Sequence, residues 1–377
     1  MSSWISFSGK ALSILSIVLI SLSGCGPAKN LAITAGNDSL AAEGKVLIAV
    51  LPLQNISSTQ APLKDIRQWL MNDFMTKGLH LLEDEALERF MVKHRMRYLG
   101  GVTKDLARDL KGETGADAVL ITSLELYSET PPPKIALTSR LVSTGNKPEI
   151  LWMDGVGLAG DDSIGPLELY LIQDPVKLSL KAVRQLSVSL AQYLSNRQGK
   201  IAGLAGSIRF WPQIFYLSPV LDPKIKYTVA VVPFFNLSGR RFAGEFMADH
   251  FIRGLLPAEN FTFIEPGIVR QTLLHLRIIM NDGISMADAR ALFATLDADL
   301  ILAGKVFDYQ DYQGAVGRPV VDFTALLIER KSQEVVWSCQ SQHVGDDGVF
   351  FFDWGKINTA YRMADDMVAS ALETLVK

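Results

Sequence analysis

This chain contains few cysteines and histidines and has almost no net charge, and each of these features argues against a class of protein. The 377 residues include two cysteines, Cys25 and Cys339, which are too few and too far apart for a disulfide framework. None of the five histidines pairs with another histidine or a cysteine at ligand spacing, which argues against a zinc site. The net charge is −3 and the isoelectric point about 6.0, so no basic field attracts nucleic acid.

Catalytic motifs are also lacking. The sequence contains no Walker loop, no G-x-S-x-G elbow and no S-x-x-K motif. Gly155–Gly160 matches G-x-G-x-x-G, but Asp161–Pro166 follows it, which is a poor helix start for a dinucleotide site, so a strand end is the better interpretation. Paired carboxylates such as Asp161-Asp162 and Asp346-Asp347 can bind calcium, but aspartates that form turns are the simpler interpretation. With Cys339 expected to be buried and inert, we predict no catalysis, cofactor or metal.

What the sequence does contain begins at the N-terminus. Lys10 precedes an uncharged apolar run, residues 11–22, whose length suits a signal peptide better than a membrane-spanning helix. The run ends in Leu22-Ser-Gly-Cys25, which resembles the lipobox of bacterial lipoproteins at all four positions. This resemblance implies cleavage before Cys25, acylation of its thiol by chains such as palmitate, and, with Gly26 next, sorting to the outer membrane. A secretory signal with a chance cysteine is the alternative.

One stretch of the chain occurs twice. Ala49–Ser57 (AVLPLQNIS) closely matches Ala230–Ser238 (AVVPFFNLS), 181 residues later (230 − 49). Each copy predicts a buried strand that ends at proline, followed by an Asn-Ser turn or helix cap. Gly115–Ser123 and Ala298–Lys305 form a second matching pair. A domain-sized unit that occurs twice indicates a duplicated domain and not a solenoid.

Both copies predict the same order of elements: strand, helix, strand, two helices, three strands and a closing helix. The expected strands are 46–51, 79–82, 118–126, 134–141 and 150–157, then 229–232, 261–264, 300–307, 320–328 and 335–343. The expected helices are 63–77, 85–98, one from Thr103 and 175–194, then 242–256, 266–279, one from Ser285 and 357–375. This order predicts an α/β fold with a mixed sheet in each copy.

The predicted domain limits follow from this repeat. They are a signal peptide at 1–24, the acylated cysteine and a flexible tether at 25–44, a first domain at 45–200, a connector at 201–226 and a second domain at 227–377. The connector is stiff and aromatic, which favours packing in the domain interface, and partner binding is the alternative. The candidate partner surface consists of Phe210, Trp211, Phe215, Tyr216, Phe350, Phe351, Phe352 and Trp354.

Basic residues gather on the predicted helices of the first copy. They are Lys93, His94, Arg95, Arg97, Lys104, Arg108 and Lys111, and the second copy has far fewer. A solvated helix face is the simpler interpretation, and a patch for anionic lipid or glycan is the alternative.

The element order, together with Ala49–Ser57, Gly115–Ser123 and their second copies, resembles the CsgG-like (curli-secretion lipoprotein) family. The same fold is implied for a penicillin-binding-protein activator lipoprotein and the TolB N-terminal domain. The resemblance implies two tandem CsgG-like domains with non-enzymatic roles in envelope assembly. A pore would need long hairpins that insert in the outer membrane, whereas Pro131-Pro132-Pro133 and Gly314–Pro319 occupy the insertion sites and interrupt strands.

The sequence therefore leads to one main hypothesis and two alternatives. The main one is a lipid-anchored periplasmic adaptor of the outer membrane, with membrane lipid bound through acylated Cys25 and an envelope protein as its partner. Homo-oligomerisation stays open. The first alternative is a subunit of a CsgG-like outer-membrane secretion or transport assembly. The second is a nucleotide-binding enzyme that uses Gly155–Gly160.

Overall fold

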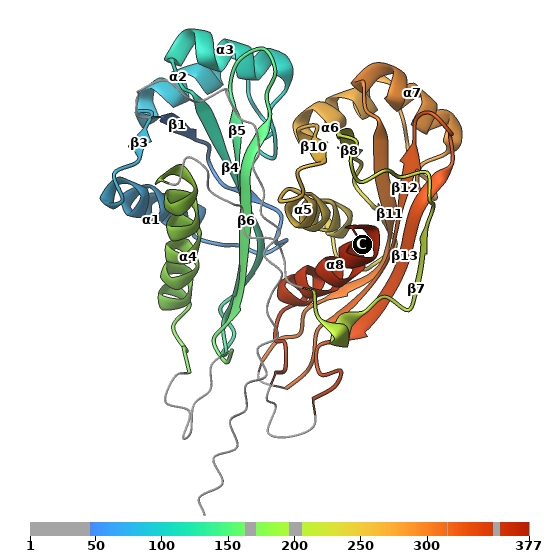
Figure 1. Ribbon diagram of the computed structural model, residues 1–377. Helices are drawn as coiled ribbons and strands as arrows, with labels where there is room; N and C mark the ends of the chain where they lie inside the picture. Colours follow the sequence, from blue (N-terminus) through green and yellow to red (C-terminus); the bar gives the residue numbers. More distant parts are fainter. Residues whose placement is uncertain (1–45, 163–170, 196–205, 315, 350–354, 377) are drawn as a thin grey trace, which may run out of the picture. The chain divides into compact units, whose positions relative to one another are not determined.

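The computed structural model describes residues 46–162, 171–195, 206–314, 316–349 and 355–376 (Figure 1). All of them belong to one unit of the chain, which extends from Ala32 to Lys377. The predicted signal peptide, Cys25 and tether lie outside the described residues, as do Phe350, Phe351, Phe352 and Trp354.

The first half of the described chain forms a mixed sheet, sheet A, with helices on it. Its strands run in the order β3-β1-β4-β5-β6, with β2 beside β4. β1 is parallel to β3 and β4, whereas β4, β5 and β6 are antiparallel. The strands are β1 (Leu47–Val50), β2 (Gln54–Asn55), β3 (His80–Leu81), β4 (Ala118–Ser128), β5 (Lys134–Ser143) and β6 (Ile150–Ala159). The helices are α1 (Leu63–Thr76), α2 (Asp84–Lys93), α3 (Lys104–Thr114) and α4 (Pro175–Ser195).

The second half forms a mixed sheet, sheet B, with the strand order β10-β8-β11-β12-β13-β7 and β9 beside β11. Its strands are β7 (Ile214–Leu217), β8 (Tyr227–Val231), β9 (Phe235–Asn236), β10 (Phe261–Phe263), β11 (Leu300–Gln310), β12 (Val320–Glu329) and β13 (Val335–Val344). Its helices are η2 (Ile208–Phe210), α5 (Ala243–Leu255), α6 (Pro266–His275), α7 (Met286–Leu296) and α8 (Ala360–Val376).

From β1 to α4 and from β8 to α8 the two halves repeat one order of elements and one strand order. The predicted α/β fold with two mixed sheets is thereby confirmed. Thr103 and Ser285 cap α3 and α7 as expected, because each side chain accepts a hydrogen bond from a backbone N–H three residues on. The second helix of each half ends earlier than predicted, because Arg95 and Arg277 adopt left-handed backbone conformations with φ of 49° and 55°.

The repeated sequence stretches have identical structural roles in the two halves. Asp117 Oδ2 accepts a hydrogen bond from Leu47 N at 2.8 Å, and Asp299 Oδ2 accepts one from Thr228 N at 2.9 Å. Each aspartate thus ties the start of the first strand to the start of its parallel neighbour. The repeated Ala-Asp pair is therefore a requirement of the sheet.

The repeated asparagine builds a turn and does not cap a helix. Asn55 Oδ1 accepts from Ser57 N at 3.1 Å and from Ser57 Oγ at 2.7 Å, and Asn55 Nδ2 donates to Thr59 O at 2.8 Å. Asn236 makes the same three bonds, to Ser238 and Arg240. Of the two predicted roles, the turn is the one observed.

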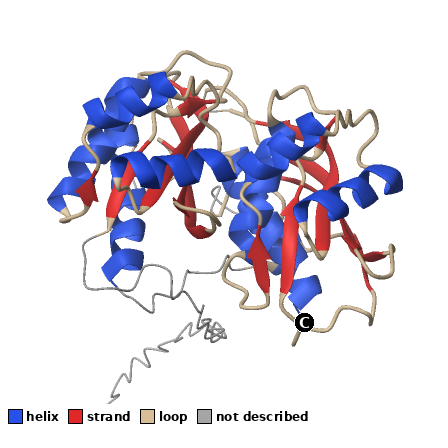
Figure 2. Ribbon diagram, turned by 90° about the horizontal axis from the view of Figure 1, so that it is seen from above, coloured by secondary structure: helices blue, strands red, loops and turns tan. Residues whose placement is uncertain are grey.

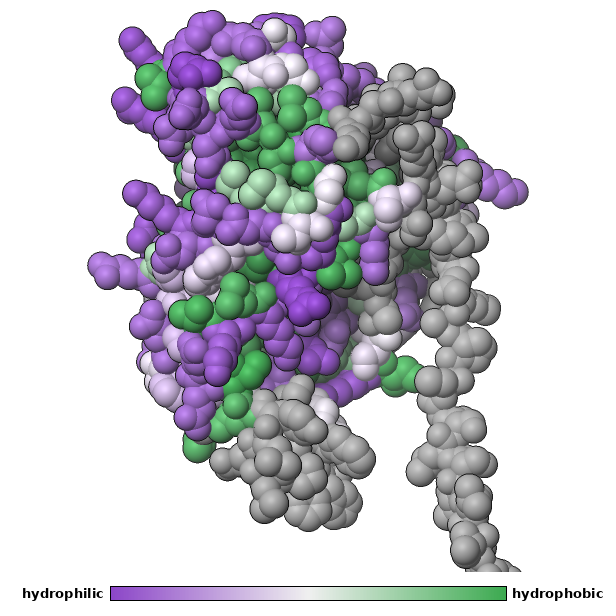
Figure 3. Space-filling view, turned by 90° about the vertical axis from the view of Figure 1, so that its left-hand side faces the viewer, coloured by the Kyte–Doolittle hydropathy of each residue, from purple (hydrophilic) through white to green (hydrophobic). Residues whose placement is uncertain are grey.

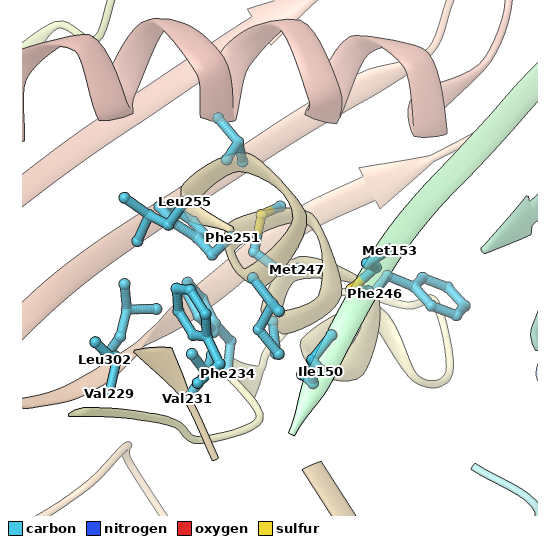
Figure 4. Packing of buried hydrophobic residues seen from close by; sticks show 14 of the residues in the cluster. Ile150, Met153, Val229, Val231, Phe234, Phe246, Met247, Phe251, Leu255 and Leu302 are labelled. Carbon is cyan, nitrogen blue, oxygen red and sulfur yellow. The ribbon is translucent and has the colours of Figure 1, made fainter. Parts of the chain in front are cut away.

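The helices lie against the strands in layers (Figure 2). α1 and α4 pack on one face of sheet A around Leu70, Phe74 and Leu186. The largest core contains α5, α8 and the facing side of sheet B, and it extends to β6, where Ile150 and Met153 join Phe246 and Met247 (Figure 4). Sheet A is consequently covered on both faces, and all ten residues of β5 are buried. β12, its counterpart, keeps an alternating pattern of burial.

The predicted connector, 201–226, is more than a connector. Its described part contains η2 and β7, and β7 extends sheet B by one strand. The loops at the two proposed insertion sites are short, since β4 ends at Ser128 and β5 begins at Lys134, and β11 ends at Gln310 and β12 begins at Val320. Among the described residues no helix combines the length and the apolar character needed to cross a membrane.

Candidate functional site

The strand β7 is the most exposed apolar element of sheet B. The exposed fractions are 64% for Ile214, 49% for Phe215, 52% for Tyr216 and 39% for Leu217. β7 pairs with β13 in antiparallel register, and within the described chain no strand pairs with its other side. An edge strand with free backbone groups and apolar side chains is a template for a further strand. It carries none of the charges or bulges that protect natural edges.

Hydrogen bonds at both ends hold β7 in place. Gln213 N donates to Gln340 O at 3.0 Å, and Gln213 Nε2 donates to Gln342 O at 2.7 Å. Beyond the strand, Ser218 N donates to Val336 O at 2.8 Å. The strand is therefore a fixed edge with a defined register.

η2 anchors the segment that leads into β7. Ser207 N donates to Ser370 Oγ of α8 at 2.9 Å, and Arg209 Nη2 donates to Gly345 O at 2.8 Å. Both contacts are with the second half, so the described part of the connector packs on sheet B and its helix α8.

The structure divides the predicted aromatic surface. Phe215 and Tyr216 are exposed on β7, and Trp211 makes an edge-to-face contact with Phe215, with ring centroids 6.2 Å apart. Phe210 does not belong to this surface, because only 1% of it is exposed and its ring packs against His343. Sequence reasoning missed Ile214 and Leu217, although the apolar run between Pro212 and Pro219 was a signal for a short strand.

The glycines of the G-x-G-x-x-G match serve packing. A Cβ atom on Gly155 would overlap the hydroxyl of Tyr361 in α8, and one on Gly157 would lie 2.6 Å from Tyr361 Cδ1. A Cβ atom on Gly160 would overlap the carbonyl of Ile172. Glycine is needed wherever another chain segment approaches this closely. The strand-end interpretation of the motif agrees with this structure, and α8 occupies the face that the first two glycines open.

The covered face of sheet A holds a buried ion pair. Arg140 of β5 is 3% exposed and its Nε donates to Glu265 Oε2 at 3.2 Å, while Glu265 is fully buried before α6. Glu265 Oε1 also accepts from Val102 N at 3.0 Å. Asp249 of α5 lies 3.8 Å from Arg140, and its pKa is raised to about 6 because burial outweighs the attraction of that guanidinium. These bonds connect segments of the two sheets.

A second buried polar cluster surrounds α8. His250 Nδ1 lies 2.6 Å from Asp365 Oδ1, Arg253 Nη2 lies 2.6 Å from Asp365 Oδ2, and Arg253 Nη1 donates to Tyr361 Oη at 2.6 Å. Burial raises the pKa of Asp365, but Arg253 and His250 outweigh it and the net shift is downward. A histidine-carboxylate pair is a familiar catalytic unit, but here His250 is buried, with 2% of it exposed.

Glu125 and Lys134 complete the polar contacts of sheet A. Glu125 is 2% exposed, accepts from Thr138 Oγ1, and has a pKa far above the ordinary value because of burial. Lys134 Nζ donates to Tyr312 O at 2.8 Å, and burial lowers its pKa to about 8. Glu125 thus bonds to the neighbouring strand β5, and Lys134 bonds to a segment of the second half.

The remaining candidate residues have structural roles. Asp162 Oδ2 accepts from Ala159 N at 2.7 Å and Asp347 Oδ2 accepts from Val344 N at 3.1 Å, so these aspartates form turns at equivalent places. No group of three or more ligand side chains suited to a metal ion occurs among the described residues. Cys339 is buried, and burial raises its pKa to about 12.

Four of the seven basic residues in and after α2 and in α3 contact carboxylates. Lys93 and His94 lie 2.7 and 2.9 Å from Glu113, Arg108 lies 2.9 Å from Asp105, and Lys111 contacts Asp117. These pairings fit the solvated-face interpretation. An open groove of about 680 Å³ beside the repeated turns has no acidic, histidine or cysteine side chain in its lining, which is Asn55, Ser58, Thr59, Gln60, Ala61, Arg241 and Phe242.

Comparison with known proteins gave solved structures only. No family model and no curated protein matches the chain. The PelC dodecamer from Paraburkholderia phytofirmans is 21% identical over 43% of this chain and 94% of its own, with a TM-score of 0.31. Lipoprotein GNA1162 from Neisseria meningitidis is 19% identical over 38% of this chain and 99% of its own, with a TM-score of 0.28. The C-terminal domain of LpoB from Escherichia coli is 14% identical over 33% of this chain and 87% of its own, with a TM-score of 0.25. At these identities and scores the similarities carry no functional assignment.

Proposed function

We propose that this protein is a lipid-anchored periplasmic adaptor of the bacterial outer membrane, which binds a protein partner in envelope assembly and catalyses no reaction. The observation that carries the proposal is the exposed apolar edge strand β7, fixed in register on sheet B. The titratable groups that resemble catalytic units, such as His250 and Asp365, are buried instead. The lipobox resemblance at Leu22–Cys25 supports the anchor, and the repeated element order supports a tandem duplication of a CsgG-like unit.

The partner's contribution follows from the chemistry of an edge. A partner that supplies an extended segment pairs with the free side of β7 through main-chain hydrogen bonds. Phe215 and Tyr216 point to opposite faces of the strand, so apolar side chains of the segment find a contact on either face. The low charge of this surface favours a segment with apolar and aromatic residues.

Site-specific photo-crosslinking in intact cell envelopes tests this proposal. A crosslinker in place of Tyr216 is expected to capture one discrete protein, whereas a crosslinker in place of Leu274 of α6, which is 61% exposed, is not. The variant Ile214→Lys/Leu217→Lys is expected to abolish the capture, because charges protect strand edges. Equal labelling at both sites, or capture that the lysines leave unchanged, would contradict the proposal. Radiolabelled palmitate on wild type and not on Cys25→Ala tests the anchor.

A further inference from the structure

The outward face of α4 combines apolar and basic side chains in helical rows. Val176, Leu180 and Val188 are 44%, 43% and 38% exposed. Lys177, Lys181 and Arg184 are exposed beside them. These residues recur at intervals of four, or nearly so, and therefore share one side of the helix. The opposite side packs on sheet A through Leu178, Ala182, Val183, Leu186 and Leu190.

No described carboxylate forms an ion pair with the cations of this face. α4 contains no aspartate or glutamate, and among the described residues none of its three cations forms an ion pair. The nearby carboxylate of Asp174 accepts from Val176 N at 2.9 Å and so serves the start of the helix. On the neighbouring α1 the exposed Lys64 and Asp65 balance each other.

The corresponding helix of the second half has the opposite character. α8 carries Asp365, Asp366 and Glu373, and most of its residues are buried between α5 and the sheets. The basic and apolar face of α4 is therefore not a requirement of the repeated fold. In Figure 3, which faces the side of α1 and α4, apolar groups (green) lie scattered among hydrophilic ones (purple).

We propose that this face of α4 docks on anionic lipid headgroups of the bilayer to which the chain is anchored. Valine and leucine side chains that alternate with lysine and arginine are typical of helices that lie in a membrane interface. The long stems of Lys177, Lys181 and Arg184 contact acyl chains while their charges reach phosphates. This inference rests on the proposed anchor, which brings the domain to the surface, and α4 then fixes its orientation.

Vesicle partitioning of the full chain tests the inference. The Cys25→Ala chain is titrated with vesicles of phosphatidylcholine alone and of phosphatidylcholine with phosphatidylglycerol. Any contribution of the apolar run 11–22 is common to both vesicles, so the change in the ratio of the two affinities between variants reports the basic face. Each cation near an anionic surface contributes about fivefold, so the variant Lys177→Gln/Lys181→Gln/Arg184→Gln is expected to lower the ratio by up to roughly a hundredfold.

A charge-matched variant provides the control. Lys224→Gln/Lys226→Gln/Lys331→Gln removes three exposed cations elsewhere and is expected to leave the ratio within about twofold of the parent. The variant Val176→Ser/Leu180→Ser is expected to weaken binding to both vesicles, and circular dichroism verifies that every variant is folded.

Three results would overturn the inference: equal affinity for both vesicles, an equal loss in the control triple variant, or unchanged vesicle binding while the α4 variant loses an acidic protein partner. The proposed lipid anchor is tested separately, because wild type without radiolabelled palmitate would contradict the anchor and leave the vesicle experiment unaffected.

Discussion

Replacement of Gly155 by alanine tests the claim that the glycine motif exists for the packing of α8. The added Cβ atom would overlap Tyr361 Oη and lie 2.6 Å from Arg253 Nη1. Tyr361 is buried, with 2% of it exposed. Its hydroxyl is held by Arg253 at 2.6 Å and by Thr138 Oγ1 at 3.0 Å, so a displaced ring loses both bonds.

The expected loss of stability has two parts. Overpacking of a close-packed core costs about 1–3 kcal/mol. A lost hydrogen bond to a charged group costs about 1.5–3 kcal/mol, and the two effects overlap because one movement causes both. We therefore expect Gly155→Ala to lower the free energy of unfolding by about 3–5 kcal/mol. The measurement is urea unfolding followed by circular dichroism and tryptophan fluorescence.

Two comparisons make the test specific. Gly112 lies inside α3, and a Cβ atom there meets nothing within 4 Å, so Gly112→Ala is expected to be neutral or to stabilise by about 0.5–1 kcal/mol. Tyr361→Leu removes the ring that Gly155→Ala would strike, so the double variant is expected to be less destabilised than the sum of the two single variants. A Gly155→Ala protein within about 0.5 kcal/mol of wild type, or strictly additive effects, would refute the packing role.

Three further outcomes follow from the structure. Glu265→Ala leaves Arg140 buried without its closest charged partner and is expected to cost about 3–5 kcal/mol in chemical unfolding. A cost below about 1 kcal/mol would show that the ion pair is dispensable. Asp249 has an ordinary pKa of 3.8 and a folded pKa of about 6, so between these values the folded state retains a proton that the unfolded chain has released, and the stability that Asp249 contributes falls as the pH rises from 3.8 to about 6. Asp249→Asn is expected to make the stability depend less on pH in this range, and an unchanged pH profile of stability would contradict the prediction. Asn55→Ala and Asn236→Ala each remove three equivalent hydrogen bonds and are expected to destabilise by a similar amount, about 1–3 kcal/mol, in thermal unfolding; a large difference between them would argue against equivalent turns.

The sequence predicts the element order well because local signals repeat. Buried strands, proline stops and hydroxyl caps such as Thr103 and Ser285 act within a few residues, and each occurs twice. The helix ends at Lys93 and His275 were missed, since the left-handed arginines that follow them carry no glycine signal. β7 was also missed, because a four-residue edge strand depends on a partner, β13, that lies more than a hundred residues away.

The contact surfaces were harder to predict than the elements. Phe210 and Phe215 are both aromatic residues of one short segment, yet one is in the core and the other is exposed. The difference arises from η2, which turns Phe210 toward His343 before the chain enters the edge of sheet B. Gly155 looked like a ligand motif or a strand end, and its role became visible only with α8 on the other side of the sheet. Contacts between elements that are distant in the sequence leave no periodic pattern from which they could be predicted.

The features that the halves share and those that distinguish them have different physical roles. Asp117 with Asp299, and Asn55 with Asn236, recur because each sheet needs the same ties between its strands. The face of sheet A that packs against α8 is not accessible to other molecules, since β5 is buried along its whole length. Two surfaces differ between the halves. They are β7, for which the described part of the first half has no counterpart, and the outer face of α4, which differs in charge from α8. The needs of the fold explain the repeated pairs, but they do not explain an exposed apolar edge strand or a helix face whose three cations form no ion pair with any described residue. Binding, as proposed above, would account for these two surfaces.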